Sequence, residues 1–161
     1  MNDSNKILPL NRLLTAVAGR RAEGLQVVFT NGCFDLIHAG HVRYLAAARE
    51  EGDLLVVGLN SDASVQRIKP PGRPVIPEHQ RAEVLAALAC VDYVTIFDGD
   101  DPGALIEAIV PEVLVKGADW TAERIVGAGT VQRAGGRVVR AALVPEVSTS
   151  GIIQRITERF C

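Results

Sequence analysis

Five short apolar runs, rich in β-branched residues, alternate along this chain with longer segments of helical spacing. The runs are Gln26–Thr30, Leu54–Leu59, Tyr93–Phe97, Val113–Lys116 and Arg137–Ala142. Each run is nearly continuous in apolar residues, as expected of a strand buried on both faces of a sheet. Strands that alternate with helices indicate βαβ units with right-handed crossovers. The sequence therefore predicts an α/β fold, a five-stranded parallel sheet with helices on both faces.

The segments between the runs have the periodicity and the end signals of helices. The predicted helices are His41–Glu51, Pro77–Ala89, Pro102–Val110 and Ser148–Phe160, with an additional amphipathic helix at Pro9–Arg20. Asp100 and Asp101 are suited to cap the helix that follows them. A length of 161 residues fits one domain. We interpret residues 1–24 as an N-terminal helical extension and residues 25–161 as a single Rossmann-like domain.

The composition excludes several classes of function. With a net charge of −2, the chain lacks the basic field that would attract nucleic acid or an anionic membrane. It has no apolar run long enough to span a bilayer, and its start does not resemble a signal peptide, so a cytoplasmic protein is expected. Cys33, Cys90 and Cys161 are too few and too scattered for a disulfide framework or a zinc site. Local cations and backbone amides must therefore hold any anionic substrate.

Polar residues and glycines follow the predicted strands, where ligands bind in sheets of this type. These groups are Thr30-Asn31-Gly32, Asn60-Ser61-Asp62, Gly117-Ala118-Asp119-Trp120 and Pro145–Ser150. Another irregular segment, Lys69–Pro77, contains four prolines. It is too short for a domain boundary, and we predict that it forms a loop over the site.

The segment from Thr30 to His41 connects the first predicted strand to the first helix that follows it. Gly32 permits a tight turn, and Gly40 lets the backbone approach a ligand closely. A helix that starts near Gly40 directs free amides and its positive dipole end toward a phosphate. His38 and His41 are three residues apart and can point to the same side, where they could donate hydrogen bonds to phosphate oxygens. Capping or core roles for these histidines remain open, and two histidines alone make a poor metal site.

This string resembles the HxGH motif of the cytidylyltransferase-like superfamily. Other segments are similar to a narrower branch, the heptose 1-phosphate adenylyltransferases of ADP-heptose synthesis. These segments are Leu59–Val65, Arg73–Pro77, Arg81–Val94, Val115–Trp120 and Ser148–Ser150. They keep their order and spacing over about Val27 to Arg155. The sequence departs from the pattern at Ala118, where relatives often have glycine, and just before Ser148.

The resemblance implies transfer of AMP from ATP to D-glycero-D-manno-heptose 1-phosphate by direct in-line displacement, with release of pyrophosphate. It also implies Mg2+ bound with ATP, a separate sugar kinase in the pathway, and a homo-oligomer, with a dimer favoured. One alternative is a cytidylyltransferase that acts on glycerol 3-phosphate or a phosphorylated amino alcohol. Another is a nucleotide-binding regulatory module without turnover.

The resemblance assigns roles to individual residues. It assigns catalysis to His38, His41 and Lys69. It assigns nucleotide binding to Thr30, Asn31, Gly32, Cys33, Phe34, Asp35, His38, Gly40, His41, Lys116, Ser148, Thr149 and Ser150. It assigns sugar-phosphate binding to Asp35, Asn60, Lys69, Arg73, Arg81, Asp119 and Trp120. The plain alternatives are helix capping for the hydroxyl residues 148–150, pairing with a protein carboxylate for Arg81, and core packing for Trp120.

Overall fold

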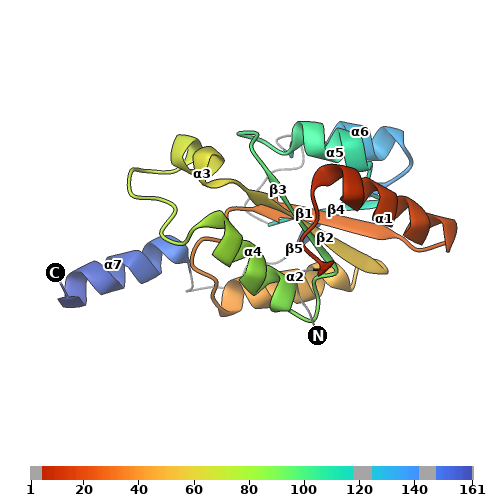
Figure 1. Cartoon of the computed structure of the whole chain (residues 1–161). Helices are drawn as coiled ribbons and strands as arrows, with labels where there is room; N and C mark the ends of the chain where they lie inside the picture. The colour runs from red at the N-terminus through yellow and green to blue at the C-terminus, as the bar shows by residue number, and fades with distance from the viewer. Residues whose placement is uncertain (1–4, 118–124, 142–147, 161) are drawn as a thin grey trace.

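The computed structural model describes residues 5–117, 125–141 and 148–160 (Figure 1). In chain order the elements are α1 (Leu10–Ala22), β1 (Val27–Gly32), α2 (Ala39–Arg49), β2 (Leu54–Asn60), α3 (Asp62–Ile68), α4 (Glu78–Ala87), β3 (Tyr93–Phe97), α5 (Gly103–Ile109), β4 (Val113–Gly117), α6 (Ala128–Arg133), β5 (Arg137–Ala141) and α7 (Thr149–Phe160). The strands form one parallel sheet in the order β3-β2-β1-β4-β5. The predicted α/β fold is confirmed.

The order of the strands determines where a ligand can bind. From β1 the chain proceeds to β2 and β3 on one side, and then crosses to β4 and β5 on the other side. Phe29 at the centre of β1 is paired with Val56 of β2 and with Leu114 of β4. The direction of winding therefore reverses between β1 and β4. In open parallel sheets, the crevice beyond the carboxyl ends of the strands at such a reversal is the usual ligand site.

Two hydrophobic cores lie on opposite faces of the sheet because successive side chains of a strand point to opposite sides. Val28 of β1 packs in a cluster with Leu45 of α2 and Leu85 of α4. Its neighbour Phe29 packs on the other face, in a cluster with Leu13 of α1. Figure 1 shows α2 and α4 on one face, and α1, α5 and α6 on the other. α1 thus packs on the sheet, and the division after residue 24 stays a prediction.

The predicted strands and helices agree with the structure to within about two residues, but two helices were not predicted. α3 and α6 are only seven and six residues long, too short to show a helical period. The start of α3 is fixed by Ser61, whose hydroxyl accepts a hydrogen bond from the Ser64 amide at 3.0 Å. This cap places α3 directly after β2, so that the loop 69–77 begins beside the carboxyl end of the sheet.

Candidate active site

A pocket of about 820 Å3 lies at the carboxyl ends of β1, β2 and β4. It contains nearly every predicted site residue that the structure describes, and only Thr30 and Arg81 do not line it. Lys69 and Arg73 of the proline-rich loop are among the lining residues, so this loop does lie at the site as predicted. Asp119 and Trp120 lie outside the described residues.

The two histidines of the motif form a stacked pair at the start of α2. Their ring centroids are 3.9 Å apart, and the edge of the Phe34 ring packs against His41. Both Nδ1 atoms are buried and have no hydrogen-bond partner in the described part of the chain. His38 is the N-cap residue of α2, but its side chain makes no capping hydrogen bond. Neither Nδ1 atom is thus used by a described residue, and the start of a helix is where backbone amides can bind an anion.

The environment of the pair determines its charge. Burial lowers the pKa of His38. It also lowers the pKa of His41 to about 4, and the neighbouring His38 contributes to that shift. Both imidazoles are therefore neutral at pH 7 in the ligand-free protein, with one N–H donor on each ring. The pair offers hydrogen bonds to an anion, while the positive charge of the site must come from other residues.

The turn before the histidines depends on a glycine. Phe34 has a left-handed backbone, with φ at 44°, which is uncommon for a bulky residue. Its ring lies so close to Gly32 that a Cβ added there would be 3.0 Å from the ring. A side chain at position 32 would displace the Phe34 ring, which packs against His41. Gly32 thus permits the close packing that orients the histidine pair.

Lys116, at the end of β4, brings a buried amine to the pocket. It is only 9% exposed, and its Nζ donates a hydrogen bond to the side-chain oxygen of Asn31 on the adjacent strand. It forms no ion pair with any described carboxylate. Burial lowers its pKa to about 8, and the charge of Asp101 opposes this shift only in part. A buried amine with so few partners is suited to bind an anionic group.

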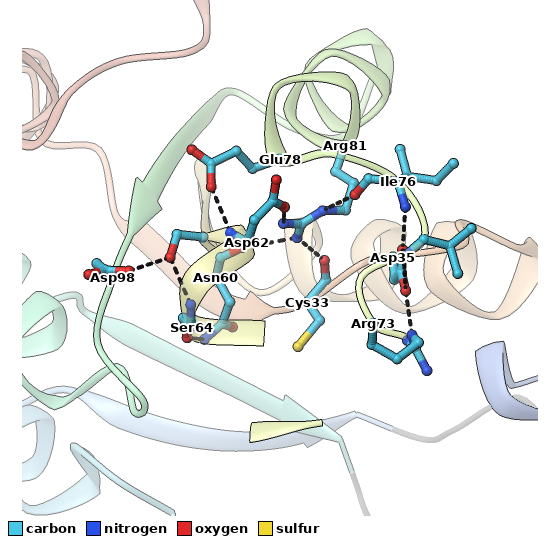
Figure 2. A network of polar contacts seen from close by, with 12 residues as sticks. Cys33, Asp35, Asn60, Asp62, Ser64, Arg73, Ile76, Glu78, Arg81 and Asp98 are labelled. Carbon is cyan, nitrogen blue, oxygen red and sulfur yellow. Dashed lines mark hydrogen bonds and ion pairs between the residues drawn. The ribbon is translucent and has the colours of Figure 1, made fainter. Parts of the chain in front are cut away.

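Arg81 does not line the pocket, but it donates hydrogen bonds to Cys33 and Asn60, which do (Figure 2). It is 1% exposed. Nε donates to the Ile76 carbonyl at 2.9 Å, Nη1 donates to the carbonyls of Cys33 (2.5 Å) and Asn60 (3.0 Å), and Nη2 donates to Asp62 at 2.6 Å. The structure thus shows Arg81 paired with a protein carboxylate. Its contact with a sugar phosphate stays a prediction, which this burial disfavours.

Asp35 is also engaged by the protein. Its side chain is completely buried and accepts hydrogen bonds from the Val75 and Ile76 amides and from Arg73. Burial would raise the pKa of Asp35, but the hydrogen bonds from Ile76, Val75 and Arg73 outweigh it and lower the pKa. Asp35 is thus ionised and linked to the loop 69–77. Thr30 is likewise fully buried, with its hydroxyl 2.7 Å from the Tyr44 hydroxyl.

The three hydroxyl residues at the start of α7 all line the pocket. The Ser148 hydroxyl accepts a hydrogen bond from the Gly151 amide at 3.0 Å, so Ser148 does cap the helix. Thr149 donates to the Leu36 carbonyl at 3.5 Å, which brings the start of α7 beside the segment that precedes His38. Phosphate binding by this trio stays a prediction.

Some pocket residues were not predicted from the sequence. They include Tyr44, Asp100, Asp101, Ile125 and Val126. Two signals could have identified the first three: Tyr44 lies one helical turn after His41, and the two aspartates follow a strand. The sequence holds no comparable signal for Ile125 and Val126.

We find no group of three metal-binding side chains, and no helix long and apolar enough to cross a membrane, among the described residues.

Comparisons with known proteins agree with this geometry. The cytidylyltransferase-like family matches residues 29–155. The bifunctional protein HldE of Mesorhizobium japonicum is 58% identical over 150 residues, which are 93% of this chain and 30% of that protein. HldE of Trichlorobacter lovleyi is 52% identical over 159 residues, 99% of this chain and 32% of that protein. The chain thus spans about a third of the length of these curated relatives.

A solved structure is also similar. It is the lipopolysaccharide core biosynthesis protein from Thermoplasma volcanium GSS1, with a TM-score of 0.61 and 25% sequence identity. The similarity covers 75% of this chain and 98% of that chain.

Proposed function

The chain belongs to the cytidylyltransferase-like family and is a nucleotidyltransferase, and from this premise we propose that it transfers AMP from ATP to a heptose 1-phosphate. The relatives named HldE support this choice of substrates, as does a structural relative named for lipopolysaccharide core biosynthesis. The five segments that resemble heptose 1-phosphate adenylyltransferases support it as well. The expected dimer and the separate sugar kinase remain predictions.

One observation carries the proposal: the stacked pair His38 and His41 at the start of α2, with both Nδ1 atoms buried and unpartnered among the described residues. A helix start with free amides is a ready-made site for phosphate. Preorganised donors stabilise the charge that develops in a transition state. The arrangement is therefore suited to a nucleotide whose α-phosphate reacts.

In the proposed reaction, an oxygen of the sugar phosphate attacks the α-phosphorus of ATP in line. The bond from that phosphorus to the oxygen bridging the α- and β-phosphates breaks, and pyrophosphate leaves with the electron pair. The attacking phosphate is already ionised at neutral pH, so no general base is required. Positioning and charge stabilisation dominate such transfers. The neutral histidines would donate hydrogen bonds, while Lys69, Arg73 and Lys116 would offset the charge of the phosphates.

Mg2+ is expected to accompany ATP and to neutralise the charge of the leaving pyrophosphate. The described residues contain no cluster of three metal-binding side chains. At nucleotide sites Mg2+ is commonly bound by phosphate oxygens and water together with one or two carboxylates.

The test is pyrophosphate release from the purified protein with Mg2+, a heptose 1-phosphate and either ATP or CTP. We expect release with ATP that requires the sugar phosphate and is lost in His41→Ala. Release with CTP and glycerol 3-phosphate or a phosphorylated amino alcohol would overturn the substrates but keep the chemistry. Nucleotide binding without release for any pair would favour the regulatory module.

A further inference from the structure

The carboxylate of Asp35 connects the histidine segment to the proline-rich loop (Figure 2). Asp35 precedes His38 by three residues, and its side chain is 0% exposed. Oδ1 accepts hydrogen bonds from the amides of Val75 at 2.8 Å and Ile76 at 2.9 Å. Oδ2 accepts a hydrogen bond from Nε of Arg73. Both carboxylate oxygens are thus occupied by the protein, and neither is exposed to a substrate.

The loop that Asp35 holds supplies two cations to the pocket. Lys69 and Arg73 both line it, and the Arg73 side chain is 12% exposed. Within the described ranges, the one side-chain hydrogen bond of Arg73 is the bond from Nε to Asp35. The terminal nitrogens of its guanidinium remain available for a ligand. A loop without this anchor would have to be ordered when the substrate binds, which opposes binding.

We propose that Asp35 is a positioning residue that holds Arg73 ready for the acceptor phosphate and does not itself touch the substrate. The inference rests on the proposed function for the identity of the acceptor. It changes the role that the sequence resemblance gave to Asp35, which was direct binding. An anchor of this kind acts on the affinity for the acceptor, so its loss should raise the acceptor KM more than it changes kcat.

Asp35→Asn is the informative variant, because asparagine keeps the shape and one oxygen for the loop amides but loses the charge that pairs with Arg73. We expect the acceptor KM to rise about tenfold, the scale of one hydrogen bond to a charged group. The KM for ATP and kcat should change less than about twofold, since the reacting groups remain in place. In an Arg73→Met background, Asp35→Asn should have almost no further effect on the acceptor KM. Additive effects, or a loss confined to kcat, would overturn the proposal.

Glu51→Gln is the matched control, because Glu51 pairs with Arg137 at 2.6 Å at the amino end of the strands, and its kinetics should equal wild type. A second readout does not need activity: hydrogen exchange of the Val75 and Ile76 amides should become faster in Asp35→Ala. Unchanged exchange would overturn the anchor even if the kinetics changed. If the wild type turned over no sugar phosphate, the proposed function would fail, while the exchange experiment would still decide whether Asp35 holds the loop.

Discussion

The two sides of the pocket differ in how their polar groups are satisfied. Beside α2, His38 and His41 bury Nδ1 atoms that have no partner in the described chain. Beside α3 and α4, Arg81 uses four of its five N–H groups on the protein, and Asp35 uses both oxygens. A buried polar atom without a partner destabilises the folded state. The histidine side therefore lowers the stability of the folded state, which is consistent with the proposed ligand site, whereas the arginine side stabilises the fold.

The largest effect expected from this difference is on folding, in Arg81→Met. The variant leaves three carbonyls and Asp62, whose side chain is 33% exposed, without their donor, and each buried acceptor left unsatisfied costs about 1–3 kcal/mol. Urea unfolding should show this loss in the free energy of unfolding. Arg137→Met is the control, since that exposed pair with Glu51 should contribute less than about 1 kcal/mol. If the two variants had similar free energies of unfolding, the arginine side of the pocket would not stabilise the fold as we propose.

His41→Ala should show the opposite behaviour. The free energy of unfolding should remain within about 1 kcal/mol of wild type, because the packing lost against His38 and Phe34 is offset by the removal of a buried nitrogen without a partner. Turnover should fall about 10²–10³-fold, equivalent to about 3 kcal/mol or more of transition-state stabilisation. Single-turnover pyrophosphate release measures the first-order step, and His38→Ala should behave in the same way. A variant that unfolds as readily as Arg81→Met, or one that turns over normally, would contradict this prediction.

The sequence predicted the location of the site better than the roles of its residues. Apolar runs located every strand, and a buried parallel sheet fixes the edge at which polar residues gather. The roles of Asp35 and Arg81 depend on contacts with residues far away in sequence. Asp35 reaches Ile76, 41 residues later, and Arg81 reaches Cys33, 48 residues earlier. Periodicity and motif spacing carry no information about such pairings, so the sequence could not name the protein partners of Asp35 or choose between a sugar phosphate and a carboxylate for Arg81.

Lys116 is expected to resemble the histidine side, because its burial in the pocket should lower the stability of the folded state. Burial lowers its pKa from 10.5 to about 8, so the folded state disfavours the ammonium form. The destabilisation is fully present below pH 8 and disappears as the pH rises to 10.5, with a size of about 3 kcal/mol. We therefore expect Lys116→Met to be more stable than wild type at pH 7, by urea unfolding. A loss of stability would place Lys116 with Arg81 as a structural residue.

The same group should control activity at alkaline pH. The ammonium form binds an anionic group, and kcat/KM reports the ionisation of the free enzyme. We therefore expect kcat/KM for pyrophosphate release to fall as the pH rises through about 8. In Lys116→Met, kcat/KM should be lower at pH 7 and should no longer fall in that range. A profile that falls at the same pH in the variant would assign this ionisation to another group.

The smallest expected effect concerns Ser148, which belongs to both sides of the comparison because it caps α7 and also lines the pocket. Ser148→Ala should destabilise the first turn of α7 by about 1 kcal/mol, the usual contribution of an N-cap hydroxyl. Since α7 has no fully buried residue, this loss should appear as faster amide exchange at Gly151. Ser148→Asp keeps a capping oxygen but places a negative charge beside the predicted phosphate site. Normal exchange with a raised ATP KM in that variant would assign Ser148 to the binding side, whereas an unchanged KM would leave it a cap alone.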